Sequence, residues 1–372
     1  MTQSRLQPLL IAALLPLLGF AWFSRPVAGQ VDFWLLWLVA MTLVGLPLVF
    51  AEVALAQRSR LVPLVGLPKL TREADVPTVW RGFGWLTIVL LALVGGHLLA
   101  SAGEVLQPIL AGQHANGGMA MPVLLAILLL ITMAASLAKR WMGWAALVLS
   151  TLALITARVH DPSTMWQMTS TSLAEWSLAV VLALVCVGAG TGLFWYSRAQ
   201  QLQIAGLSDH QASQALVISA SRAVLPIWAV QLVVGGLVAM SVAPTTTFAR
   251  ISYALAMLAG SGYLLATLTE QVALFTVQRR FHLLAMVGLA VVMYVLALLP
   301  TTWLNQLLIL ISFISAIWLA VFAGWQMKIS HLRKAMNFGS EATYNLWRIA
   351  VRIIVPLAIL LAVIGWVGSL LT

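Results

Sequence analysis

Among the side chains that can carry charge, five within or beside otherwise apolar segments are the candidates for chemistry. They are Arg25, Glu52, His97, Glu104 and Glu270. A charged group at the centre of a membrane helix costs about 2.5–3.5 kcal/mol on insertion scales, so such residues are candidates for function. The chemistry that these residue types support is proton transfer, ion pairing and gating.

His97 and Glu104 are seven residues apart in one apolar segment and therefore share a helix face. A buried His–Glu face is suited to relaying protons. In the alternative interpretation, His97 bonds a backbone carbonyl in the bundle and Glu104 meets water at the headgroups. Glu270, near Thr267 and Thr269, is a third candidate for proton coupling, or else pairs with an arginine on the inner side.

Two apolar segments, the first and the sixth, are interrupted by glycine. The first runs over 6–22 and breaks at 19–26, and the sixth runs over 176–196 and breaks at 188–192. In lipid, the backbone groups that a break frees need partners from protein or from a lined cavity. Paired broken spans, one in each half of a chain, point to the binding site of a secondary transporter.

The substrate site predicted at these breaks is formed mainly by backbone groups. Its residues are Leu18, Gly19, Phe20, Ala21, Gly188, Ala189, Gly190 and Thr191. Amides at the half-helix N-termini are expected to face a substrate carboxylate. The few nearby side chains are small or apolar, which favours a small apolar amino acid or amine.

Arg25 stands at the outer side of the first break, and Glu52 lies near the inner end of the second span. Arg25 is either an interfacial arginine that reaches the headgroups or a gate beside the substrate path. Glu52, one turn from Gln57 and Arg58, is interpreted as a structural hydrogen-bond partner.

The elements that must position these residues are membrane-spanning helices. Hydrophobic residues make up 62% of the 372 and charged residues only 8%, too few to cover a soluble domain. We predict a single all-α transmembrane domain over 1–372 with about eleven spans. The predicted spans are 6–24, 33–57, 82–108, 121–138, 141–158, 173–199, 214–241, 247–276, 282–299, 304–328 and 347–371.

Orientation follows from the basic residues. If the N-terminus is cytoplasmic, seventeen of the 20 lysines and arginines face the cytoplasm, and only Arg25, Arg158 and Arg250 lie outside. The C-terminus is then external. This bias and contact with anionic lipid headgroups explain the net charge of +10 without nucleic acid as a partner.

The span count also predicts an internal repeat. If 6–158 and 173–328 are equivalent units of five spans, the odd number inverts the second unit in the membrane. The two broken spans then come first in each unit and face each other. The helix at 347–371 lies outside the repeat.

Several other chemistries are disfavoured. The single Cys186 excludes an internal disulfide and a multi-cysteine metal site, and we expect no metal centre. The glycines at 188–192 lack the preceding strand and the GK[ST] sequence of a phosphate-binding loop. No hydrolase constellation such as His-Glu-x-x-His or Gly-x-Ser-x-Gly occurs, so we predict that the chain is not an enzyme.

The motifs resemble those of the neurotransmitter:sodium symporter family, in a shortened bacterial form with eleven helices. Residues 45–58, GLPLVFAEVALAQR, are similar to the second-helix run G-[IL]-P-L-x-x-x-E-x-A-[LM]-G-[QR] of that family. Residues 19–25 and 176–192 resemble its unwound first and sixth helices, and 324–337 with 352–356 resemble the tenth and eleventh. The similarity covers most of the chain in order. It implies the LeuT fold and alternating-access transport of amino acids or related amines in the bacterial inner membrane.

The chain departs from that family at the ion ligands. Trp22 stands where the family has a sodium-binding asparagine, and Cys186 stands near its partner threonine. A residual ion site would use Leu15, Leu18, Gly260 and Ser261. The outer gate would pair Arg25 with Asn305, where the family has an aspartate.

These departures leave two functions open. The first is a transporter coupled to Na⁺, as the resemblance implies, or to H⁺ through His97, Glu104 or Glu270. The second is a receptor or assembly subunit that is derived from a transporter and does not transport. In either case the lipid bilayer is a partner, and a homodimer or a membrane partner subunit is left open.

Overall fold

The computed structural model describes residues 2–19, 23, 27, 29–111, 120–160, 166–207, 220–239, 245–276 and 281–371. These residues are almost entirely helical, and no β-strand occurs among them. A single isolated bridge pairs Gln30 with Gln167. The predicted site residues Phe20, Ala21 and Arg25 lie outside the described residues.

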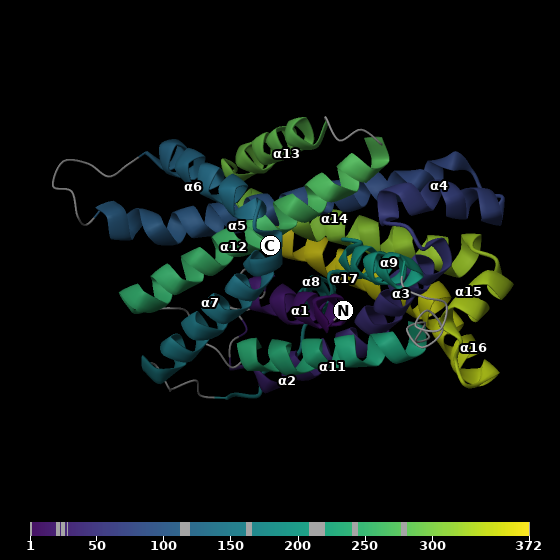
Figure 1. The fold of residues 1–372 in the computed structure, drawn as a ribbon. Helices are drawn as coiled ribbons and strands as arrows, with labels where there is room; N and C mark the ends of the chain where they lie inside the picture. Colours follow the sequence, from purple (N-terminus) through teal and green to yellow (C-terminus); the bar gives the residue numbers. More distant parts are fainter. Residues whose placement is uncertain are drawn as a thin grey trace.

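The helices follow the predicted spans (Figure 1). Those of the first half are α1 (Thr2–Gly19), α2 (Val31–Ala40), α3 (Leu46–Ser59), α4 (Pro63–Ala74), α5 (Gly82–Ala111), α6 (Met121–Ser136) and α7 (Lys139–His160). Those of the second half are α8 (Leu173–Val187), α9 (Leu193–Leu207), α11 (Ala220–Ala239), α12 (Thr247–Thr276), α13 (Phe281–Ala297), α14 (Thr301–Val321), α15 (Ile329–Met336), α16 (Glu341–Ile349) and α17 (Val355–Leu371). A 3₁₀ turn at Thr78–Arg81 precedes α5.

Short π-helical turns join α2 to α3 and α16 to α17 into continuous spans, and a third extends the end of α14. They lie at Met41–Gly45, Phe322–Gln326 and Ala350–Ile354. With these joints, seven described helical segments are long and apolar enough to cross a membrane, and four shorter apolar helices accompany them. The predicted all-helical fold with about eleven spans is therefore confirmed. The division into repeats at 6–158 and 173–328 stays a prediction.

Two helices, α4 and α15, do not appear among the predicted spans. Both are short and amphipathic, so they fall below the length of a bilayer crossing. In α4, Leu64, Leu67 and Leu70 recur every three residues and are all buried. That spacing, with Pro63 in the first turn, is a helix signal that a search for long apolar runs passes over.

Helix α12 is the core of the bundle. It packs against α5, α6, α7 and α13, and 89% of its most apolar stretch is buried, against 28% for α7. Small residues allow this close packing, as expected between membrane helices. A Cβ at Gly262 would lie only 3.1 Å from the Cβ of Ala135 in α6.

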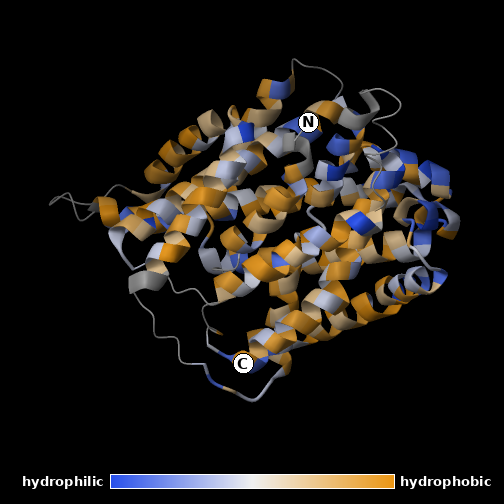
Figure 2. Ribbon diagram, turned by 60° about the horizontal axis from the view of Figure 1, so that its bottom comes forward, coloured by the Kyte–Doolittle hydropathy of each residue, from blue (hydrophilic) through white to orange (hydrophobic). Residues whose placement is uncertain are grey.

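Polar residues gather at one end of the molecule. In Figure 2 the hydrophilic residues cluster at the right, where α4, α15 and α16 lie in Figure 1. Large apolar side chains cover the outer helix faces, including Leu283 and Leu284 of α13 and Leu357 of α17. This distribution is typical of a protein that is surrounded by lipid.

Candidate functional site

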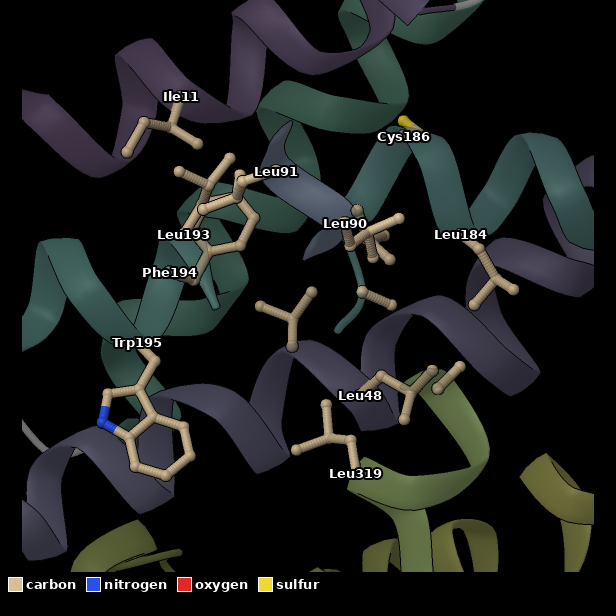
Figure 3. Packing of buried hydrophobic residues seen from close by; sticks show 14 of the residues in the cluster. Ile11, Leu48, Leu90, Leu91, Leu184, Cys186, Leu193, Phe194, Trp195 and Leu319 are labelled. Carbon is tan, nitrogen blue, oxygen red and sulfur yellow. The ribbon is translucent and has the colours of Figure 1, made fainter. Parts of the chain in front are cut away.

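A small enclosed cavity lies where the end of α1 meets the break between α8 and α9. Its volume is about 60 Å³, room for a few water-sized groups. The lining residues are Ile11, Leu14, Leu15, Leu18, Gly19, Leu90, Leu91, Val94, Leu98, Leu184, Val185, Gly188, Ala189, Thr191, Leu193, Gly260, Tyr263, Leu264, Leu308 and Ser312. Figure 3 shows Ile11 of α1, Leu91 of α5 and Leu193 of α9, which all contribute to this lining.

The predicted break in the sixth span is present. Residues 188–192 are not helical, and φ is +57° at Gly188, +77° at Gly190 and +67° at Gly192. Residues with a Cβ rarely adopt this left-handed conformation, so glycine is needed at all three positions. Of the eight predicted site residues, the structure places Leu18, Gly19, Gly188, Ala189 and Thr191 together around the cavity.

Glu52 of α3 binds the backbone of this break. Its Oε1 accepts hydrogen bonds from the amides of Gly190 (2.9 Å) and Gly192 (3.3 Å). The carboxylate therefore sits at the N-terminus of α9, where the helix dipole favours negative charge. These two amides are engaged by the protein, so the expectation that they face a substrate carboxylate is wrong for this structure. The interpretation of Glu52 as a structural partner is confirmed.

Two hydroxyl groups satisfy further backbone groups of the break. Ser315 Oγ of α14 donates to the carbonyl of Gly190 (2.9 Å), and Thr191 Oγ1 donates to the carbonyl of Gly188 (2.6 Å). Sequence reasoning missed Ser315, which is 125 residues from its partner. Because freed backbone groups in lipid need such partners, these contacts make the irregular segment stable at membrane depth.

Leucine side chains pack against the glycines at the candidate ion position between α1 and α12. A Cβ at Gly260 would lie 2.6 Å from Leu18 Cδ1, and one at Gly188 would lie 2.7 Å from Leu15 Cδ1. Ser261 Oγ donates to the carbonyl of Gly95 in α5 (3.1 Å). A hard cation needs several oxygen ligands directed at one point, and here aliphatic carbon packs against the glycines.

A second polar group, which we call the His97 cluster, consists of His97, Ser101 and Asn305. His97 is buried in α5; its Nε2 is 2.6 Å from Asn305 Oδ1 of α14 and its Nδ1 is 3.3 Å from Ser101 Oγ. An amide oxygen only accepts, so Nε2 donates to Asn305, and both partners of the ring are uncharged side chains. Glu104 is exposed and accepts a hydrogen bond from Thr301 Oγ1 (2.9 Å). Proton coupling through His97 and Glu104, and a gate of Asn305 with Arg25, stay predictions.

The third polar group, the Glu270 cluster, consists of Gln7, Lys139, Tyr196, Gln200 and Glu270. Lys139 Nζ lies 2.7 Å from Glu270 Oε2 and 2.6 Å from the Tyr196 hydroxyl, which also bonds Glu270. Gln200 donates to Glu270 (3.3 Å) and accepts from Gln7 of α1 (3.3 Å). The expected arginine partner of Glu270 is thus wrong, because the cation is Lys139, which begins α7. Proton coupling through Glu270 stays a prediction.

Comparisons with known proteins identify the fold. No protein-family model and no curated protein matches the sequence. Among solved structures, the chain is similar to MhsT in complex with L-phenylalanine, with a TM-score of 0.61 and 16% identity over 96% of this chain and 98% of that chain. It is also similar to a mutant manganese transporter of Eremococcus coleocola, with a TM-score of 0.59 and 15% identity over 99% of this chain and 88% of that chain. The chain therefore has the LeuT-like transporter fold that its sequence motifs imply.

Proposed function

We propose that this protein is a secondary active transporter that moves a small amino acid or related amine across the cell membrane by alternating access. The observation that carries the proposal is the cavity between the end of α1 and the glycine break of 188–192. It lies where paired broken helices place the substrate in such transporters. We place it in the bacterial inner membrane with a cytoplasmic N-terminus and an external C-terminus, on the strength of the distribution of basic residues.

The lining of the cavity favours an organic, largely apolar substrate. Among the described lining residues there is no carboxylate, imidazole or thiol, the side chains that hold transition metals. Thr191, Tyr263 and Ser312 are the polar side chains there and are suited to orienting one amino group. An amino acid or amine with a short aliphatic side chain fits this surface better than a metal ion.

The packing around Gly260 also bears on the identity of the coupling ion. Leu18 against Gly260, and the bond from Ser261 to Gly95, support weak or absent sodium coupling. Protons are the alternative, carried by His97, Glu104 or Glu270. Uptake into proteoliposomes after a sodium jump or a pH jump distinguishes sodium coupling from proton coupling. A flux that responds to neither gradient contradicts both kinds of coupling.

A matched pair of glycine variants tests the site. In Gly190→Val the new Cβ would collide with the Ser315 side chain and φ is +77°, so uptake should be abolished. In Gly288→Val the new Cβ has no neighbouring heavy atom within 4 Å, so uptake should be retained. Both variants should insert into the membrane at wild-type levels. Equal uptake by Gly190→Val and wild type contradicts the proposed site.

The second candidate function is a receptor or assembly subunit that does not transport. The specific observation in its favour is the packing of Leu15 and Leu18 against the glycines at the ion position. Thermal stabilisation by one member of an amino-acid and amine panel, with accumulation in proteoliposomes, supports transport. Stabilisation without accumulation supports a receptor, and co-purification of a fixed partner supports a subunit.

A further inference from the structure

A large groove opens at the polar end of the molecule and shares no lining residue with the cavity described above. It has a volume of about 1080 Å³ and lies between the end of the α14 span, α15 and the start of the α16–α17 span. Its lining includes Lys328, Arg333, Lys334 and Arg352 against one carboxylate, Glu341. Four cations against one acid make a strongly positive pocket.

The local charges are arranged to leave this positive field in place. Arg333 pairs with Glu341, but their side chains are 55% and 73% exposed, so the pair is weak. Arg352 donates to the carbonyl of Gly324 and stacks over Trp325, with 5.0 Å from the guanidinium carbon to the ring centre. These contacts hold the guanidinium at the groove without neutralising it.

The neighbouring His331 responds to the same field. Burial first, and then the charge of Arg58, lower the pKa of His331, with Lys328 and Lys334 adding to the effect and Glu73 opposing it. The buried face of α15, with Leu332 and Met336, packs toward α3. Its basic residues are thus directed to the groove side and to solvent.

Exposed apolar side chains border the groove on one side. Trp325 and Ile329 line it and are 58% and 43% exposed. On the following helix, Leu346, Ile349 and Ile353 are at least half exposed. A soluble anion needs no such border, whereas a phospholipid needs apolar surface beside its headgroup. Basic pockets between membrane helices near the interface are suited to anionic headgroups.

We propose that this groove binds the phosphate of an anionic phospholipid, with Arg333 and Lys334 contacting the phosphate and the acyl chains lying along Trp325 and Ile329. The proposal goes beyond the transport function and does not depend on it. A free phosphate ion carries the same charged group, but we propose that the ligand is the lipid.

The test is thermal unfolding of the full chain in neutral detergent, titrated with phosphatidylglycerol, phosphatidylcholine or inorganic phosphate, with native mass spectrometry to count bound lipids. Phosphatidylglycerol should stabilise the protein at the lowest concentration, and inorganic phosphate should have no effect at matched phosphate concentration. The variant Arg333→Gln/Lys334→Gln should need about tenfold more phosphatidylglycerol, since each cation near the surface contributes to headgroup binding.

Two further variants separate a built site from general surface charge. Glu341→Gln removes the one acid of the groove and should strengthen phosphatidylglycerol binding about two- to threefold, an effect that misfolding does not produce. Arg140→Gln removes an exposed cation that stacks on Trp141 elsewhere in the chain, and should change binding less than twofold. The proposal is contradicted if Arg140→Gln weakens phosphatidylglycerol binding as much as Arg333→Gln/Lys334→Gln does, or if Glu341→Gln weakens it. It is also contradicted if inorganic phosphate stabilises the protein as much as phosphatidylglycerol does, or if the protein shows no preference for phosphatidylglycerol over phosphatidylcholine.

Discussion

The His97 cluster and the Glu270 cluster lie at different levels of the bundle and use different chemistry. Helices α5 and α12 are antiparallel, because Trp85 contacts Phe275 while Gly95 accepts from Ser261. His97 therefore lies near the middle of α5, on the other side of the Gly95–Ser261 contact from Glu270, which lies near the end of α12. The His97 cluster joins α5 to α14 by the hydrogen bond from His97 to the uncharged Asn305. The Glu270 cluster joins α7 to α12 through an ion pair and attaches α1 and α9 by hydrogen bonds.

The difference concerns which helices each cluster restrains. The Glu270 cluster includes residues of α1 and α9, the two helices that end or begin at the breaks, and fixes them to the unbroken α7 and α12. The hydrogen bond between His97 and Asn305 connects two unbroken helices, α5 and α14. We infer that opening the cavity toward Glu270 requires breaking an ion pair, while opening it toward His97 requires breaking hydrogen bonds to uncharged side chains.

The variant Lys139→Met is expected to have the largest effect on the population in which the cavity is open. It leaves Glu270 without its cation in a partly buried site, where the side chains are 17% and 37% exposed. Removing one partner of a buried pair costs about 3–5 kcal/mol, and partial exposure reduces this to about 2 kcal/mol. If the pair closes the cavity, the open population rises by roughly thirtyfold.

Thiol labelling measures this population. Cys186 is the sole cysteine and is buried, so Cys186→Ala with Ser312→Cys places one reporter thiol in the cavity lining. Lys139→Met should accelerate labelling by a membrane-impermeant reagent from the side of the basic residues. Arg140→Met, at the neighbouring exposed cation, is the control and should leave the rate unchanged. Faster labelling from the side opposite to the basic residues would contradict the inference that the Glu270 cluster closes the cavity toward those residues.

A smaller effect with the opposite sidedness is expected for Asn305→Ala. It removes the acceptor of His97 Nε2, and the loss of one hydrogen bond to an uncharged acceptor costs about 1 kcal/mol. Labelling of the same reporter should accelerate about fivefold, from the side opposite to that affected by Lys139→Met. The control is Gln306→Ala, which removes the hydrogen bond from Trp366 to α14. A response to both variants would assign the effect to α14 packing in general.

The comparison also shows what the sequence could predict. Long apolar runs and the glycines of 188–192 are local signals, and the structure has the expected spans and the expected break. The sequence also singled out His97 and Glu270, because polar residues in apolar runs are conspicuous, and the family resemblance pointed to Asn305. What it did not predict is which of them meet.

Partners within the clusters are set by packing between distant segments. His97 and Asn305 are 208 residues apart, and Glu52 and Gly190 are 138 apart, so no spacing rule connects them. Lys139 lies in the short loop between two predicted spans, where a cation is expected to meet water. Its buried ion pair arises because α7 begins against α12, which is a property of the assembled bundle.

The smallest effect is expected for Thr301→Val, which removes the hydrogen bond to the exposed Glu104. Water replaces an exposed partner, so the cost should stay within about 0.5 kcal/mol and labelling should change about twofold or less. Glu104 lies on the same helix face as His97, and this variant tests whether the two act as one unit. If they relay protons together, Thr301→Val should shift the pH dependence of uptake as much as Asn305→Ala does. If only Asn305→Ala shifts the pH dependence of uptake, that dependence rests on His97 without Glu104. Glu104 is then a residue of the membrane surface.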